Sequence, residues 1–275
     1  MERYQRCGRG RIARGYAVSG FDADWLALRA GADARARDKG LAARMAAYLA
    51  ERDQVRVLDL GAGTGANLRA TAPLISAAQH WALADNDMAL LARAQPVANV
   101  AVTRCAVDLA GELSGLFDPV PDLVTASAFF DLCGADWIDR LVALVASTGA
   151  AFYAVLTYDG REDWAPSHPL DTEVLAAFHA DQRRDKGLGL ALGPDAQAAF
   201  AGSLRGHGYI VFEGRSDWVL SQPDDAGLIA ALANGSAATV GATIGLAEAE
   251  RWRAARCAAA RVTIGHQDLL ALPPR

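Results

Sequence analysis

The sequence predicts an α/β fold with a mostly parallel, seven-stranded sheet covered by helices on both faces. Two observations predict it. Short apolar runs rich in β-branched residues alternate with helical stretches between residues 54 and 158, and this alternation is typical of parallel sheets. Three glycines at alternate positions, Gly61, Gly63 and Gly65, then follow the first apolar run. Glycine weakens strands and helices, so this spacing indicates a special turn between them.

The segment before the first strand predicts an N-terminal helical cap over residues 1–52, followed by one domain over 53–275. Residues 22–52 are rich in Ala, Arg and Leu, with apolar side chains at helical spacing. Buried strands are then predicted over residues 55–60, 80–85, 100–108, 122–130 and 149–158. The helices between them are predicted near residues 66–72, 87–95 and 134–146.

After Tyr158 the alternation stops. Residues 159–193 are polar, aromatic and interrupted by Pro and Gly, and they are too long for an ordinary loop, so we interpret them as an insertion that covers an active site. A helix is predicted from Pro194, followed by a strand over 209–220 with a bend at Gly214. Residues 224–260 form a second, helical insertion, and 261–272 the last strand.

Composition narrows the class of protein. The chain has 275 residues, 52% of them hydrophobic, which suits one large domain with insertions. A net charge of −5 disfavours a nucleic-acid binder, which normally carries a basic face. No apolar run has the length of a bilayer span or follows the pattern of a signal peptide. We expect a soluble, cytoplasmic protein with no membrane contact.

The four cysteines, Cys7, Cys105, Cys133 and Cys257, are scattered and form no CxxC pair. This spacing disfavours a zinc site and a disulfide framework, and it predicts reduced, buried thiols. The histidines lack the paired spacing of a zinc helix, so no metal site is predicted. His207 and His266 each lie beside a glycine and are interpreted as turn residues.

The three glycines indicate a ligand cradle. A strand that turns through glycines into a helix presents backbone N–H groups and the positive helix end at the carboxyl edge of the sheet. The spacing differs from the dinucleotide motif GxGxxG, and no GK[ST] follows as in a Walker loop.

The string "VLDLGAGTG" resembles the first motif of class I S-adenosylmethionine-dependent methyltransferases. The resemblance covers roughly residues 54–158 and implies a three-layer, Rossmann-like sheet with its last strand antiparallel. It also implies S-adenosylmethionine as cofactor and S-adenosylhomocysteine as product. The acid Asp59 would help to hold the ammonium group of the cofactor. The methionine end would lie against the loop and the residues near it, Gly61, Ala62, Gly63, Thr64, Gly65 and Asn67.

Two further acids match the family. Asp85 and Asn86 follow the second strand, where the resemblance implies a carboxylate that accepts both ribose hydroxyls. Met88 would pack on the adenine. Asp108 would accept the adenine amino group, and Leu109 would offer its backbone N–H to the ring. The alternative for either acid is a helix N-cap, which Asn86 or Asp87 could also supply after the second strand.

The fourth strand leads to the acceptor side, where the family carries residues facing the methyl group. Here the candidates are Ser127, Phe129, Phe130 and Asp131. Asp131 is a candidate base, although an N-cap for the next helix explains it equally well. Two histidines of the first insertion and the tyrosine before it are further candidate proton acceptors: His168, His179 and Tyr158. The sequence lacks the [DNS]PP[YFW] motif and the Pro-Cys pair of nucleic-acid base methylation.

Arg29 and Arg37 lie on one helix face and could bind a carboxylate of cofactor or substrate. Ion pairs with Asp33, four residues from each, are the simpler interpretation. The favoured function is methyl transfer to a small-molecule acceptor. The alternatives are an RNA methyltransferase that uses the basic N-terminal segment, a non-methyl enzyme of the same cofactor fold, and a non-catalytic cofactor-binding partner subunit.

Overall fold

The computed structural model describes residues 23–274, and the basic segment before Ala23 lies outside them. Its sheet has the strand order β3-β2-β1-β4-β5-β8-β6, and β7 pairs with β8 outside this path. The strands are β1 (Gln54–Leu60), β2 (Ala78–Asp85), β3 (Val100–Ala106), β4 (Leu123–Ser127), β5 (Ala151–Ala165), β6 (Ile210–Arg215), β7 (Trp218–Ser221) and β8 (Arg261–Leu272). The first five strands are parallel, and β8 is antiparallel to its neighbours β5, β6 and β7.

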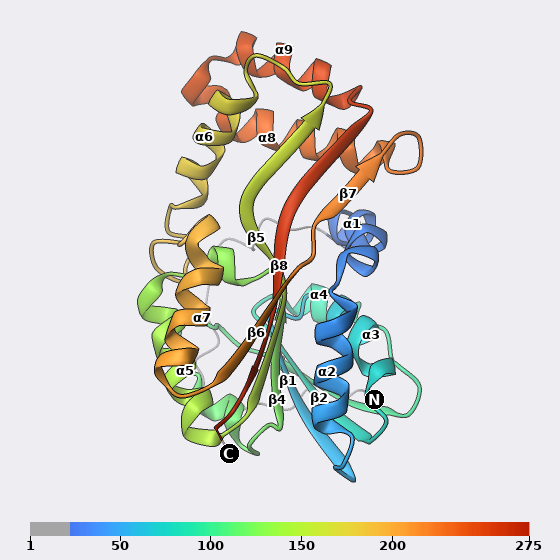
Figure 1. The fold of residues 1–275 in the computed structure, drawn as a ribbon, viewed down its shortest axis with the longest axis vertical. Helices are drawn as coiled ribbons and strands as arrows, with labels where there is room; N and C mark the ends of the chain where they lie inside the picture. Colours follow the sequence, from blue (N-terminus) through green and yellow to red (C-terminus); the bar gives the residue numbers. More distant parts are fainter. Residues whose placement is uncertain (1–22, 275) are drawn as a thin grey trace.

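Helices cover both faces of the parallel part, as Figure 1 shows. The helices are α1 (Ala23–Ala36), α2 (Lys39–Leu49), α3 (Ala66–Thr71), α4 (Met88–Ala92), α5 (Ala135–Thr148), α6 (Asp171–Gln182), α7 (Ala196–Gly206), α8 (Ala226–Ile244) and α9 (Leu246–Cys257). The side chains of α5 and α7 enter one apolar core, and those of α2 and α3 enter another. The expected α/β architecture with an antiparallel last strand is confirmed.

A second lobe extends beyond the parallel sheet, at the top of Figure 1. The strands β5 and β8 continue past the sheet and pair again from Glu162 to Ala165, and β7 joins the same part of β8. Helices α6, α8 and α9 cover this extension with an apolar core of its own, which includes Trp164, Val174 and Trp252. We call this unit the upper lobe.

The upper lobe corrects two expectations. The fifth strand does not end at Tyr158 but runs to Ala165, because the extension finds a partner in β8. Residues 159–193 are therefore not a simple cover: β5 and α6 contribute to the core of the upper lobe, and only a short part reaches the cavity described below. Replacing residues 161–190 with a flexible loop would remove Trp164 and Val174 from this core.

The strand expected over 209–220 is two strands, so the described sheet has eight. The break lies at Ser216 and Asp217 and not at Gly214. There the chain passes from the sheet-side half of β8 to its upper-lobe half, and the Ser216 N–H donates to the His266 carbonyl at 2.9 Å. Because β6 and β7 pair with two different parts of β8, the chain has to leave the first part before it joins the second.

Helix α8 departs from the expectation that no segment is long and apolar enough for a membrane span. Its 19 residues meet that test by length and composition. In the fold, however, it buries Leu228, Ile229 and Val240 in the core of the upper lobe.

The expectation of reduced thiols is wrong for Cys105, which is disulfide-bonded. Cys133 and Cys257 are free, and Cys7 lies outside the described residues.

Candidate functional site

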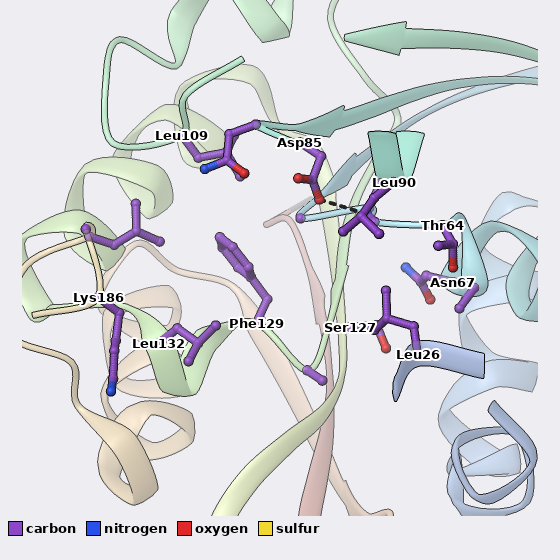
Figure 2. Close-up of a pocket in the computed structure, with 18 of the residues that line it drawn as sticks. Leu26, Thr64, Asn67, Asp85, Leu90, Leu109, Ser127, Phe129, Leu132 and Lys186 are labelled. Atoms are coloured by element: carbon purple, nitrogen blue, oxygen red, sulfur yellow. Dashed lines mark hydrogen bonds between the residues drawn. The ribbon is translucent and has the colours of Figure 1, made fainter. Parts of the chain in front are cut away.

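A cavity lies at the carboxyl ends of the central strands, where open α/β sheets bind ligands (Figure 2). The loops after β1, β2, β3 and β4 form most of its wall, and α1 and residues 186–188 complete it. The predicted cofactor residues on the wall are Gly61, Ala62, Gly63, Thr64, Asn67, Asp85, Asn86, Asp108, Leu109 and Ser127.

The glycine loop has backbone angles that favour glycine. Gly61, Gly63 and Gly65 have φ values of +63°, +49° and +73°, a region where L side chains are strained. A Cβ on Gly61 would also lie 2.6 Å from the Phe129 ring, so this glycine admits the aromatic side chain as well. The alternate glycines thus allow both the turn of the loop and the close packing of Phe129 against Gly61.

Asp85 fastens this loop to the end of β2. One carboxylate oxygen accepts the Gly63 N–H at 2.8 Å, and the other accepts the Asp87 N–H at 2.9 Å. Burial raises the pKa of Asp85. The N-cap alternative is wrong for Asp85, because Asp87 caps α4 by accepting the N–H groups of Ala89 and Leu90.

The cavity wall near the third strand carries Asp108 and Leu109. The Asp108 carboxylate accepts the Ala110 N–H at 2.9 Å in a local turn, and the Leu109 carbonyl accepts the Trp137 indole N–H at 2.7 Å. Met88 does not lie on the wall: it is the first residue of α4, is 52% exposed, and Leu90 lines the cavity in its place.

Asp59 lies behind the wall. Its side chain is fully buried, and one oxygen accepts the Asn67 amide N–H at 2.8 Å. The other oxygen has no hydrogen-bond partner among residues 23–274. Asn67 does line the cavity, so its amide links Asp59 to the wall.

Arg37 orients Asn67 from the opposite side. Its guanidinium donates to the Asn67 amide oxygen at 2.9 Å and to the Ser127 hydroxyl at 3.4 Å. The predicted ion pair of Arg29 with Asp33 is confirmed, whereas that of Arg37 is wrong. Helix α1 ends at Ala36 and Asp38 caps α2, so Arg37 lies between two helices and the four-residue spacing does not apply. The N-cap signal of Asp38 could have revealed this.

The pKa of Asp59 gives a testable pH dependence. Burial raises the Asp59 pKa from 3.8 to about 7, and the Asn67 hydrogen bond and the Arg37 charge only partly oppose this rise. Because the folded state holds the proton more tightly, ionisation favours unfolding as the pH rises between these values. We expect the free energy of unfolding of the ligand-free protein, relative to Asp59→Asn, to fall from about pH 4 to 7 and then level. Urea unfolding of both proteins across this pH range measures the difference. If the free energies of unfolding of the two proteins change with pH in parallel, the prediction is contradicted.

The acceptor side of the wall is formed by Ser127, Phe129 and Leu132 after β4. Phe129 points into the cavity in Figure 2. Phe130, predicted as substrate-binding, is buried in the core instead and stacks on Phe200 at 4.2 Å between ring centroids. Successive residues of the turn point in different directions, so only one of the two aromatic rings can reach the cavity.

Asp131 neither lines the cavity nor caps α5, whose N-cap is Gly134. Burial raises its pKa to about 6, and the charge of Arg29 opposes the rise.

The other candidate proton acceptors do not lie on this wall. The Tyr158 hydroxyl lies 3.1 Å from the Glu162 carboxylate and 3.0 Å from the His179 ring nitrogen, in a half-buried network. Burial raises the pKa of Tyr158 and lowers that of His179. His168 accepts the Leu170 N–H in the turn before α6. None of these three candidate proton acceptors therefore lines this cavity.

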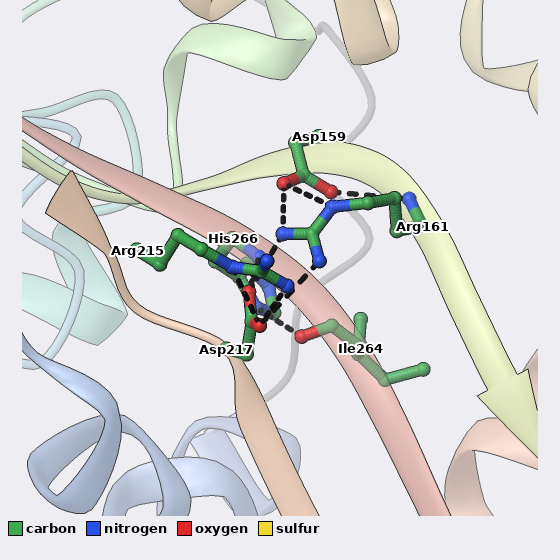
Figure 3. A network of polar contacts seen from close by, with 6 residues as sticks. All are labelled: Asp159, Arg161, Arg215, Asp217, Ile264 and His266. Carbon is green, nitrogen blue, oxygen red and sulfur yellow. Dashed lines mark hydrogen bonds and ion pairs between the residues drawn. The ribbon is translucent and has the colours of Figure 1, made fainter. Parts of the chain in front are cut away.

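A network of ion pairs and hydrogen bonds links β5, the segment between β6 and β7, and β8 (Figure 3). Asp217 forms ion pairs with Arg161 and Arg215, and its carboxylate also accepts the backbone N–H of His266 at 3.2 Å. His266 is not a turn residue but a buried residue of β8. Burial and the Arg29 charge lower its pKa to about 4, so the imidazole is neutral near pH 7. Its Nδ1 lies 3.1 Å from the Ile264 carbonyl.

Sequence reasoning missed several wall residues. They are Leu26, Asp33, Ala66, Leu90, Ala128, Leu132, Lys186, Gly187 and Leu188. Residues 186–188 reach the cavity because two backbone hydrogen bonds fasten the segment to β4's exit: Gly134 N–H to the Leu188 carbonyl, and Leu192 N–H to the Cys133 carbonyl. No local sequence pattern signals such a tertiary contact.

Comparisons with known proteins place this geometry in a known fold. No family model and no curated protein sequence matches the chain. A cyclopropane-fatty-acyl-phospholipid synthase-like protein from Lactobacillus casei is 14% identical, with 92% of this chain and 95% of that chain covered and a TM-score of 0.51. The YcgJ protein from Bacillus subtilis is 13% identical, with 86% and 100% covered and a TM-score of 0.50.

A third structure is a SAM-dependent methyltransferase from Thiobacillus denitrificans, in complex with S-adenosyl-L-homocysteine. It is 17% identical, with 93% of this chain and 99% of that chain covered and a TM-score of 0.46. At these identities the likeness concerns the fold. Together with the strand order and the antiparallel β8, it gives the chain the fold of the class I S-adenosylmethionine-dependent methyltransferases.

Proposed function

We propose that the protein is an S-adenosylmethionine-dependent methyltransferase that acts on a small-molecule acceptor. One observation carries the proposal: a single cavity gathers the glycine loop, Asp85 and the Asp108–Leu109 pair from three separate strand ends. These are the positions at which the family resemblance implies contacts with the methionine, ribose and adenine parts of the cofactor.

The donors and acceptors of the wall suit such a cofactor. Asp85 has two carboxylate oxygens for a ribose diol, and Asp108 with Leu109 offers an acceptor and a backbone donor for an adenine edge. At the other end, Asn67 and Ser127 line the cavity, and Asp59 keeps one buried oxygen without a partner among the described residues. A buried acid of this kind suits a cationic ammonium group nearby.

The residues of the chain then have to position the acceptor and exclude water. When bound, S-adenosylmethionine supplies a methyl group on a good leaving group. Phe129 and Leu132 form an apolar part of the wall, and α1 with residues 186–188 completes it, which favours alignment of the acceptor with the methyl group. The acids on the wall already accept hydrogen bonds from within the chain, so none of them is assigned the role of a base. A concave site of this kind suits a small molecule.

Two measurements test the proposal. Calorimetry should give saturable binding of S-adenosylhomocysteine, and incubation with methyl-labelled cofactor and a small-molecule metabolite extract should release S-adenosylhomocysteine and label a small molecule. Label in RNA instead would favour the RNA alternative. Release of S-adenosylhomocysteine without a methylated product would favour an enzyme that uses the cofactor in another way. Binding of the cofactor without turnover would favour a non-catalytic partner subunit. Absence of binding would refute the proposal.

A further inference from the structure

Arg29 carries an unused donor on the cavity wall. The residue is 9% exposed and lines the cavity. Its Nε and Nη2 donate to Asp33 at 3.0 and 3.1 Å, whereas no hydrogen bond within residues 23–274 uses Nη1. Nη1 retains access to solvent, so it can donate to an acceptor group of a ligand in the cavity.

The guanidinium of Arg29 is held in place by its neighbours. Its central carbon lies 4.8 Å from the centre of the Trp218 ring, and the Trp218 indole N–H donates to the same Asp33 carboxylate at 3.0 Å. Arg29, Asp33 and Trp218 therefore join α1 to β7 in one fixed arrangement. A donor held this way loses little entropy when it binds an anion.

Three groups interact with the Arg29 charge. They are the Asp33 carboxylate, which also accepts the Trp218 N–H, the Asp131 carboxyl, which does not line the cavity, and the neutral His266. Lys186 lines the same cavity; its ammonium pairs with Asp181 at 3.1 Å and retains further N–H donors. The remaining wall acids, Asp85 and Asp108, lie at the end assigned to the nucleoside.

Apolar side chains lie beside Lys186 on the cavity wall. Figure 2 shows Lys186 beside Leu132 and Phe129, on the side away from Thr64 and Asn67. Leu188 adds to this wall from the segment that carries Lys186. Such a surface stabilises a hydrophobic body by burying its apolar area.

We infer that Arg29 forms a carboxylate subsite on the cavity wall, and that the methyl acceptor is a small amphipathic acid whose apolar body packs on Phe129 and Leu132. The inference rests on the proposed function and names its substrate class. The one guanidinium nitrogen left free offers two N–H donors, which match the two oxygens of a carboxylate, whereas a phosphate with three acceptor oxygens would need more donors.

The test uses matched pairs of aliphatic and aromatic carboxylic acids and their primary amides, with S-adenosylhomocysteine release as the readout. We expect kcat/KM for the preferred acid to exceed that of its amide at least tenfold. The R29Q/D33N variant, which removes both partners of the Arg29–Asp33 ion pair, should raise KM for the acid at least tenfold and change that of the amide less than twofold. Arg29→Lys, which keeps the charge, should recover part of the loss. Arg35→Gln, on the solvent side of α1, serves as the matched control.

Binding of the cofactor product separates the alternatives. The inference requires that R29Q/D33N bind S-adenosylhomocysteine within twofold of the parent. If its affinity falls while that for 5′-methylthioadenosine, which lacks the amino-acid part, is kept, Arg29 holds the cofactor carboxylate and the inference is wrong. Amides as good as acids, or no turnover of either class by a protein that binds S-adenosylhomocysteine, would also overturn it. Failure of the parent to bind S-adenosylhomocysteine would refute the proposed function itself.

Discussion

Replacing Gly63 with valine is expected to remove measurable S-adenosylhomocysteine binding, a loss of at least about a hundredfold, or roughly 2.8 kcal/mol. Gly63 has φ +49°, lines the cavity and donates its N–H to Asp85. A β-branched side chain is strained at this φ and would fill space at the loop, where its Cβ would already lie 3.4 Å from Leu26. Calorimetry measures the affinity, and thermal unfolding reports whether the variant remains folded.

The backbone strain itself should cost about 1–3 kcal/mol, so a control must separate strain from lost ligand space. Gly149 has a similar φ of +68°, follows α5, and a Cβ there would meet nothing within 4 Å. Gly149→Val should therefore lower the melting temperature by a similar amount and leave the affinity unchanged. A folded Gly63→Val protein with the affinity of the parent would refute the ligand cradle.

The part of the cavity wall formed by the glycine loop, Asp85 and Asp108 could be predicted because its signals are local. Strands end at Leu60, Asp85 and Ala106, and each is followed within two residues by a glycine or an acid. The carboxyl ends of parallel strands meet at one edge, so residues far apart along the chain come together without further information. The exceptions depend on side-chain direction: Met88 faces solvent and Leu90 the cavity, a difference of about half a helical turn in α4.

The upper lobe and the part of the cavity wall formed by residues 186–188 could not be predicted, because they are built by contacts between distant segments. The extension of β5 depends on its pairing with β8 about a hundred residues later, and periodicity within residues 159–165 does not reveal that partner. The position of Lys186 depends on backbone hydrogen bonds between residues 188–192 and Cys133–Gly134. The histidines of the insertion looked catalytic by residue type alone, but they serve the upper lobe and its turns.

The second large effect is expected at Asp85. If its carboxylate accepts two ribose hydroxyls, Asp85→Ala should weaken S-adenosylhomocysteine binding by about 1.5–3 kcal/mol, the range of hydrogen bonds to charged groups. That corresponds to roughly a 10- to 150-fold rise in Kd. The loss includes the loop contact, because the same carboxylate accepts the Gly63 N–H. Asp85→Asn keeps one oxygen for that contact and should give a smaller loss.

Asp87→Ala is the matched comparison, because Asp87 caps α4 and does not line the cavity. It should lower the free energy of unfolding by about 0.5–2 kcal/mol, as loss of an N-cap does, and change the affinity little. The two neighbouring acids are thus expected to give opposite patterns, with binding lost at position 85 and mainly stability lost at position 87. If Asp85→Ala instead lowers stability and leaves calorimetric affinity unchanged, Asp85 only fastens the glycine loop, and the nucleoside must bind elsewhere.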